Sequence, residues 1–196
     1  MALDIFSSKG IIVYCFLDED EALYNTEIGN VTVMGSTKDD GFLKFIGHKC
    51  EAFVAIEDAK QRRKTVKMLN ERRKVMPVNA IHEKAVISEN AWLGHGNFIN
   101  AGVVVNTGAK VPSHCVLHSG ALIENDVELG EFVQIGAGSI VAAKARIGSG
   151  VVIGPGATIA TGVTIGKDAQ IGPGSVVLQD VEEEDVVFGV PAKPVG

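Results

Sequence analysis

A strict six-residue repeat fills the second half of the chain and constrains the fold more than any other feature. Counted in sixes from Ile81 to Val177, the first position is aliphatic in all seventeen repeats. The fifth position is usually small, and Asn97 is the clear exception. A helix would need a 3.6-residue period, which this pattern lacks. The repeat predicts a parallel β-helix with three short strands in each turn.

Residues 1–78 follow a different pattern and predict a small α/β domain ahead of the β-helix domain of residues 79–196. Apolar, β-branched runs are expected to form strands of a parallel sheet, the first of them buried, at 11–16, 31–34 and 53–56. Helices are expected over 39–46 and 57–73. The basic clusters Arg62-Arg63-Lys64 and Arg72-Arg73-Lys74 are interpreted as a solvated helix face, with phosphate binding as the alternative.

Composition excludes several classes of protein. A net charge of −6 argues against a broad nucleic-acid surface. No apolar run approaches the roughly 20 residues that cross a bilayer, so no membrane partner is expected. The segment 11–17 lacks the flanks of a signal peptide. The three scattered cysteines lack CxxC spacing, which favours a reduced, cytoplasmic setting.

Several segments resemble one known family. They are 15–18, 80–82, 85–88, 130–132 and the closing Gly-Val-Pro-Ala-Lys of residues 189–193. With the α/β domain in front, nearly the whole chain resembles the left-handed β-helix sugar acetyltransferases of the sialic-acid O-acetyltransferase type. Nucleotide-amino-sugar N-acetyltransferases belong to the same group. The resemblance implies a homotrimer, acetyl-CoA as co-substrate between neighbouring prisms, and a sugar hydroxyl or amine as acceptor.

The catalytic positions that the resemblance implies hold unexpected residues. Where the family has a catalytic His followed by an acid, this chain has Asn125 and Asp126. Where the family has an Asn, it has His118, and a His near the thioester is replaced by Gln134. An amide cannot act as a general base.

Three interpretations of these replacements stay open. In the first, the chain is an active acetyltransferase in which His118 serves as the base, and His118 and Asn125 share a corner of the prism. In the second, it is a catalytically impaired trimer that binds CoA and sugar in a scaffold or regulatory role. In the third, Asn125 is an engineered or sporadic replacement in an otherwise ordinary enzyme.

Blocks of Gly and Pro recur at intervals of eighteen residues and should stack on one corner of the prism. A column of this kind leaves bare backbone that suits the pantetheine arm of acetyl-CoA. Turning the corner would by itself also account for these residues. The expected CoA-binding residues are Gln134, Ala137, Gly154, Pro155, Gly172 and Pro173.

The start of the chain resembles the helix that follows a Gly-rich loop in the family. The α/β domain is therefore expected to lack its first strand and that loop, and with them a backbone cradle for nucleotide phosphates. Asp18 is the expected substrate-binding residue, through a ribose or base.

A metal enzyme is the competing class, because γ-type carbonic anhydrases share the prism and hold zinc with three His. His114 and His118 are four residues apart, and His95 precedes His114 by nineteen. A third ligand at a matching corner is lacking, so no metal site is predicted.

Overall fold

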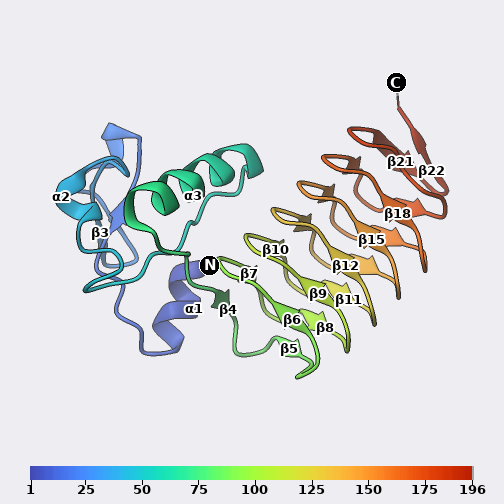
Figure 1. Ribbon diagram of the computed structural model, residues 1–196, viewed down its shortest axis with the longest axis horizontal. Helices are drawn as coiled ribbons and strands as arrows, with labels where there is room; N and C mark the ends of the chain where they lie inside the picture. Colours follow the sequence, from blue (N-terminus) through green and yellow to red (C-terminus); the bar gives the residue numbers. More distant parts are fainter. Residues whose placement is uncertain (196) are drawn as a thin grey trace.

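The computed structural model describes residues 1–195, which form an N-terminal region packed on the first turns of a long left-handed β-helix (Figure 1). The chain ends at the far end of the β-helix. The predicted order of a small α/β region followed by hexapeptide turns is confirmed.

The β-helix consists of seventeen two-residue strands, each ending on the aliphatic first position of a repeat. They are β4 (Ala80–Ile81), β5 (Val86–Ile87), β6 (Trp92–Leu93), β7 (Phe98–Ile99), β8 (Val104–Val105), β9 (Lys110–Val111), β10 (Val116–Leu117), β11 (Leu122–Ile123), β12 (Glu128–Leu129), β13 (Gln134–Ile135), β14 (Ile140–Val141), β15 (Arg146–Ile147), β16 (Val152–Ile153), β17 (Thr158–Ile159), β18 (Thr164–Ile165), β19 (Gln170–Ile171) and β20 (Val176–Val177). Strands eighteen residues apart pair in parallel, as Leu117 does with Ile135.

The strands build three faces. Face one contains β4, β7, β10, β13, β16, β19 and a terminal hairpin; face two runs from β5 to β20, and face three from β6 to β18. Aliphatic first positions such as Leu117 and Ile135, and small fifth positions such as Ala121, are fully buried between the faces. The glycine corner joins faces one and two, the polar corner joins faces two and three, and the helix corner joins faces three and one. In the central turns these corners are residues 118–120, 124–126 and 130–132.

Asn97, the exception in the repeat, is fully buried at a fifth position. Its Oδ1 accepts the backbone N–H of Cys115 at 2.8 Å, and its own N–H donates to Oδ1 of Asn79 at 2.8 Å. Its side-chain oxygen therefore satisfies one backbone N–H of the next turn, whereas its Nδ2 is buried without a hydrogen-bond partner among the described residues.

The prediction that residues 180–185 leave the prism is wrong. Val181 bridges to Ile165, and Val186 pairs with Gln170, so the coil makes a further partial turn with two residues fewer than the repeat. Strand β21 (Val186–Gly189) then pairs with β22 (Ala192–Pro194) in an antiparallel hairpin that extends face one.

The N-terminal region combines short helices with one small mixed sheet. Its elements are α1 (Ala2–Ser8), β1 (Phe16–Leu17), the 3₁₀ turn η1 (Glu21–Leu23), β2 (Glu27–Ile28), β3 (Val31–Gly35), α2 (Asp40–Leu43) and α3 (Ala59–Arg73). Strand β3 pairs in parallel with β1, as expected, but β2 pairs with β3 as an antiparallel hairpin.

Two strand predictions in this region are wrong. Segment 11–16 contributes only Phe16 to a strand, and Ile11, Ile12 and Tyr14 are 50, 76 and 74% exposed. Segment 53–56 has no regular secondary structure. An apolar run specifies burial and β propensity, but a strand also needs a neighbour to take its backbone hydrogen bonds. Phe53 packs instead on Phe6 of α1, with ring centroids 5.6 Å apart.

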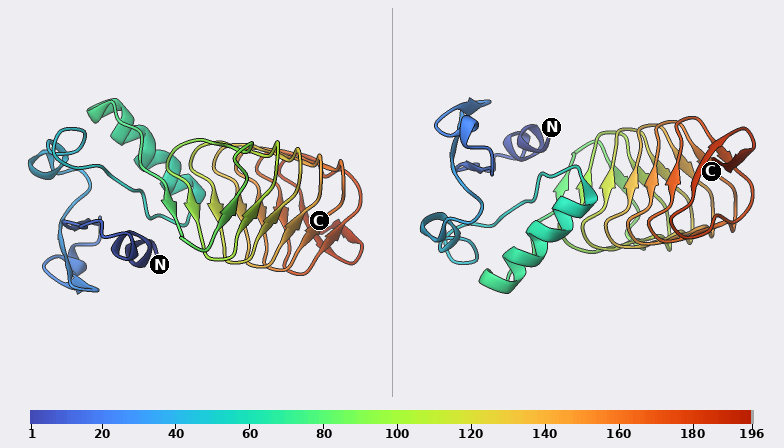
Figure 2. Two further views of the ribbon diagram at one scale, coloured as in Figure 1. Left: turned by 90° about the horizontal axis from the view of Figure 1, so that it is seen from below. Right: turned by 90° about the horizontal axis from the view of Figure 1, so that it is seen from above.

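Two helices join the N-terminal region to the β-helix, as Figure 2 shows from two sides. Helix α1 covers the first turns of face one, where its Ile5 packs with Ala80, Phe98 and Val116. Helix α3 buries Arg62, Val66 and Leu69, spaced three and four residues apart on one side.

The prediction that the basic clusters form a solvated helix face fails at Arg62, which is only 2% exposed. Its guanidinium donates to the backbone carbonyls of Ile56, Glu57, His114 and Phe132. Arg73 similarly donates to the carbonyls of Lys44 and Ile46. The donors of Arg62 and Arg73 are occupied by backbone, so these two residues fasten α3 in place. Lys64, Arg72 and Lys74 are exposed, as the prediction expected.

Candidate functional site

The candidate site lies on face one, at the first turn of the β-helix that the N-terminal region does not fully cover. Phe98 and Val116 are buried beneath α1, whereas Gln134, one turn further along, is partly exposed. Gln170, two further turns along, is exposed. Gln134 is therefore the first polar side chain at the edge of the covered surface.

His118 reaches this edge from the glycine corner. It directly follows β10, and the register that pairs Val116 with Gln134 places Gln134 on the next turn. The Nε2 atoms of His118 and Gln134 are 3.3 Å apart. The ring also lies edge-on to Phe98, at 6.4 Å between centroids. The predicted residues His118 and Gln134 are thus neighbours in space.

A third residue, Glu57, joins this pair and was missed by the sequence analysis. It precedes α3 in the chain, and its Oε1 lies 4.0 Å from Nε2 of His118. The Glu57 side chain is 78% exposed and that of His118 is 20% exposed. No repeat or motif marks Glu57, because its approach depends on how the segment before α3 lies against the β-helix.

The Gly and Pro blocks stack on the glycine corner beyond His118, as predicted. Ala137, Pro155 and Pro173 are exposed along it, and Gly154 is partly exposed. A Cβ on Gly154 would lie 2.6 Å from the backbone nitrogen of Pro173, so close stacking of the turns already requires glycine there. Gly172 is buried, and a Cβ there would collide with the ring of Phe188.

A second set of glycines on this corner has open space beside it. Gly138, Gly156 and Gly174 adopt φ values of +66°, +68° and +65°, and a Cβ on any of them would have no neighbour within 4 Å. The positive φ accounts for glycine at these positions. Their effect is an uncovered strip of backbone that begins next to His118.

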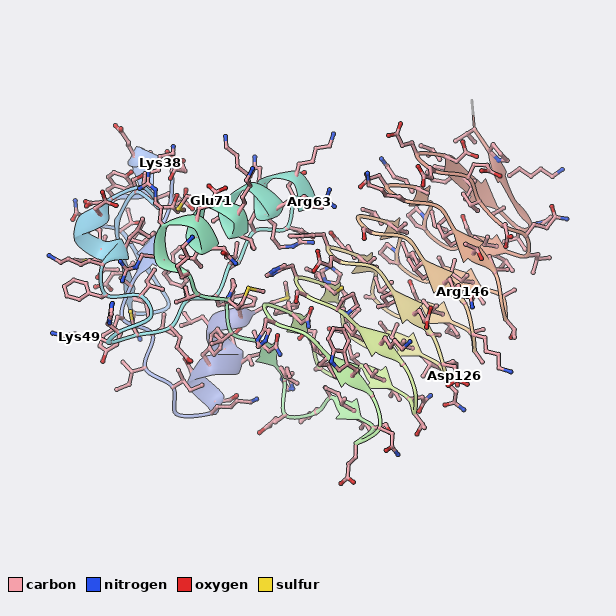
Figure 3. The ribbon with its side chains drawn as sticks, in the orientation of Figure 1. Lys38, Lys49, Arg63, Glu71, Asp126 and Arg146 are labelled. Carbon is pink, nitrogen blue, oxygen red and sulfur yellow. The ribbon has the colours of Figure 1, made fainter. Side chains whose placement is uncertain are left out.

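Asn125 and Asp126 lie on the polar corner, at the other end of β11 from His118. The expectation that His118 and Asn125 share a corner is wrong within one protomer, because each turn of the prism has three corners. Asn125 and Asp126 are both exposed, and the Asn125 carbonyl accepts the N–H of Lys144 at 2.9 Å. Asp126 lies at the edge of the β-helix away from Arg63 of α3 (Figure 3).

Asp18 is exposed at the end of β1 in the small sheet, away from the cluster formed by His118, Gln134 and Glu57. Its Oδ1 accepts the N–H of Asp20 at 2.9 Å. The neighbouring Glu19 carboxylate accepts hydrogen bonds from Ser36, Thr37 and Lys38. Lys38 first, and then Thr37, lowers the pKa of Glu19 to about 2. Binding of a sugar nucleotide at Asp18 stays a prediction.

His114 lies on the helix corner and is not part of the cluster. It is 4% exposed, and its ring stacks on Phe132 with 4.8 Å between centroids. Burial, and then the positive charge of Arg62 and the neighbouring His95, lowers the pKa of His114 to about 4. Among residues 1–195, no three His, Cys, Asp or Glu side chains are grouped so that they could hold a metal ion.

Two hollows of the surface lie outside the group formed by His118, Gln134 and Glu57. One is open around residues 46–52, and another lies beneath α3 against His114 and Phe132. Across the described part of the chain, no helix has the length and apolar character needed to span a membrane.

The arrangement around His118 can perform proton transfer. An imidazole nitrogen with an amide and a carboxylate within 4.0 Å can take a proton from an acceptor group and hold the resulting charge. The adjoining strip of bare backbone offers hydrogen-bonding groups without side-chain bulk.

Comparison with known proteins places the chain in a family. Residues 144–179 match the family model of the bacterial transferase hexapeptide (six repeats). No curated protein matches the chain in sequence.

Solved structures match over the whole chain. PerB from Caulobacter crescentus, in complex with CoA and GDP-perosamine, is 31% identical, with a TM-score of 0.89, and the match covers 100% of this chain and 91% of PerB. A variant of the Caulobacter perosamine N-acetyltransferase with asparagine in place of a histidine was solved with the same ligands; it is 31% identical, with a TM-score of 0.90 and coverage of 100% and 90%.

The acetyltransferase domain of PglB from Neisseria gonorrhoeae, in complex with acetyl coenzyme A, is 25% identical, with a TM-score of 0.90 and coverage of 99% of this chain and 92% of that domain. The expected co-substrate, acetyl-CoA, agrees with the ligands of these structures. On its sequence identity and coverage with PerB, its fold and its repeats, the chain belongs to the hexapeptide-repeat sugar acetyltransferases.

Proposed function

We propose that the chain transfers the acetyl group of acetyl-CoA to the amine of a nucleotide-linked amino sugar. The observation that carries this proposal is the approach of His118 to Gln134, 3.3 Å apart, at the start of the bare strip on the glycine corner. PerB, which matches the whole of this chain, was solved with CoA and GDP-perosamine, and this favours an amine over a hydroxyl acceptor. A cytoplasmic location stays a prediction.

In the proposed reaction, Nε2 of His118 takes the proton from the acceptor nitrogen as that nitrogen attacks the thioester carbon. Gln134 donates a hydrogen bond to the thioester oxygen, where negative charge develops. When the intermediate collapses, the C–S bond breaks and the imidazolium returns the proton to the CoA sulfur. The products are an N-acetylated sugar and free CoA thiol.

The proposed homotrimer accounts for Asn125 and Asp126. In a ring of three parallel prisms, each interface joins two different surfaces. One prism contributes one of its corners, and its neighbour contributes a different corner. Asn125 and Asp126 are exposed on the polar corner and are free to face the glycine corner of a neighbouring protomer. There Asn125 would hydrogen-bond a ligand without transferring a proton, and Asp126 would supply negative charge.

A second candidate is a trimer that binds CoA and sugar but turns over slowly or not at all. The amide at Asn125 supports it, because an amide cannot accept a proton at neutral pH. The Caulobacter variant with asparagine in place of a histidine still bound CoA and GDP-perosamine, so loss of a histidine is compatible with ligand binding in that relative.

Release of CoA thiol from acetyl-CoA, measured with a panel of nucleotide amino sugars and sialic acids, tests the proposal. The His118→Ala variant should lower kcat about 100-fold or more, as expected for loss of a general base. His82→Ala is the matched control, because His82 occupies the same corner two turns earlier. Full activity of His118→Ala would remove His118 as the base. Calorimetric binding of acetyl-CoA without turnover on the whole panel would favour the second candidate.

A further inference from the structure

The structure assigns Glu57 as the acidic partner of His118, a positioning residue that the N-terminal region supplies to the acetyl-transfer centre of the β-helix. This inference rests on the proposed function, because it concerns the same centre. It adds a residue outside the repeats and gives the N-terminal region a part in the chemistry.

The backbone of Glu57 is held in place by the buried Arg62 and by the N-terminal cap of α3. Nη1 of Arg62 donates to the carbonyls of Ile56 and Glu57, at 2.8 and 2.6 Å. The side chain of Asp58, the next residue, caps α3 by accepting the N–H of Gln61 at 2.7 Å. The main chain at Glu57 is therefore fixed, although its side chain is largely exposed.

The same guanidinium binds the two turns that carry the rest of the cluster. Nε of Arg62 donates to the carbonyl of His114 at 3.1 Å, and Nη2 donates to that of Phe132 at 3.4 Å. His114 leads into β10, which His118 follows, and Phe132 leads into β13, which begins with Gln134. Arg62 thus links Glu57 to the strands that carry His118 and Gln134.

Of the three side chains around the His118 ring, Glu57 is the acidic one. The ring faces Gln134 of β13, which is neutral, Phe98 of β7, which is apolar, and Glu57 from the segment before α3. Among residues 1–195, Glu57 is the acidic group within 4.0 Å of Nε2.

This placement suits the charge that develops during the reaction. The proton taken from the acceptor nitrogen arrives on Nε2, and the imidazolium then carries a positive charge 4.0 Å from the Glu57 carboxylate. The carboxylate stabilises that state more than the neutral ring, so it lowers the barrier to proton transfer. No further reactant is needed, because the proton leaves with the CoA thiol. Since Glu57 is exposed, solvent limits the effect.

The first test compares the kinetics of Glu57→Gln, Glu57→Asp and a control. Glu57→Gln, which keeps the size of the side chain and removes its charge, should lower kcat about tenfold, a modest electrostatic effect at an exposed site. It should leave the KM of acetyl-CoA within about twofold. Glu57→Asp should recover part of the loss, and Glu51→Gln, an exposed change in the same region, should have no effect. A change confined to the KM of the amino sugar would overturn the inference, because Glu57 would then bind the substrate.

The second test does not need turnover. In the full-length protein with ¹⁵N-labelled histidine, the ring signals of His118 are identified by their loss in His118→Ala. Glu57→Gln should shift those signals, and Glu51→Gln should leave them in place. An unchanged His118 spectrum in Glu57→Gln would overturn the pairing even if the enzyme is active. A shifted spectrum in a protein without turnover on any acceptor would keep the pairing and refute the proposed function.

Discussion

Arg62 of α3 donates from Nε to the carbonyl oxygen of His114, 3.1 Å away, and so ties the N-terminal region to the helix corner of the prism. The guanidinium is 2% exposed, and burial lowers its pKa. A buried charge is costly unless its donors are satisfied. Here backbone carbonyls of the N-terminal region and of the β-helix accept these hydrogen bonds. No other side chain has the planar set of donors that this contact needs.

Replacing Arg62 with Met should destabilise the protein by about 3 kcal/mol or more, because buried carbonyls lose their donors. Lys64→Met, an exposed change on the same helix, should cost less than about 0.5 kcal/mol. Urea unfolding curves of the two variants measure the difference. If both variants unfold at the same urea concentration, the tie contributes little to stability.

His114 should make the protein sensitive to acid. Its pKa is about 4 in the folded state and near 6.5 in the unfolded chain, so the unfolded state binds more protons between these values. Stability therefore falls as the pH drops from 6.5 to 4, by about 3 kcal/mol in total for this group. His114→Asn should flatten this dependence, because Asn tolerates the φ of +65° and does not titrate.

The control for this prediction is His48→Asn, since His48 is exposed. Denaturant unfolding at several pH values between 4 and 7 gives the dependence for each variant. A slope that persists in His114→Asn would assign the acid sensitivity to other groups.

The β-helix could be predicted from the sequence because its period is unbroken from Ile81 to Val177. Counting by eighteen also predicted which residues share a corner, and the stack formed by Ala137, Pro155 and Pro173 follows from it. The same count separates His118 from Asn125 by seven residues, one more than the six-residue step between corners, so the two residues lie on adjacent corners. The expectation of a shared corner was wrong because successive strands lie on different faces, with a different corner at each end of a strand. The end of the coil was missed because the last turn is two residues shorter.

The N-terminal region was harder to predict because its contacts follow no period. The run from Ile11 to Phe16 indicates a strand by composition, but only Phe16 finds a partner, in β3. Arg62 looked like one cation among many, and its burial depends on where α3 lies. Glu57 reaches His118 only because Arg62 fixes the segment before α3, so no local pattern could have identified it.

The strip on the glycine corner predicts a difference between two similar substitutions. Gly156 and Gly162 both have positive φ, +68° and +73°, and both have open space where a Cβ would lie. Gly156 is on the glycine corner and Gly162 is on the polar corner. Asn tolerates this backbone conformation, so each change should cost only about 1 kcal/mol of stability.

If acetyl-CoA lies along the glycine corner, Gly156→Asn should raise the KM of acetyl-CoA about tenfold, because the new side chain projects into the space that the pantetheine arm needs. Gly162→Asn should raise this KM less, because in the proposed trimer its side chain reaches the acetyl-CoA site only from the neighbouring protomer. Steady-state kinetics at varied acetyl-CoA, with melting temperatures to confirm folding, provide the measurement. Equal KM values would mean that these glycines only turn the corners.

Restoring histidine at Asn125 tests whether the polar corner retains a latent catalytic position. Asn125→His should raise kcat about tenfold or more if this residue faces a bound acceptor in the assembled protein, because an imidazole adds a second proton acceptor. Asn125→Gln keeps an amide and should leave kcat unchanged. Ala143→His, one turn further along the same corner, should also give no gain. A gain that survives in the double variant His118→Ala, Asn125→His would show that the new base acts independently of His118. No gain in Asn125→His, with acetyl-CoA still bound, would mean that Asn125 lies outside the reacting centre and that His118 acts alone.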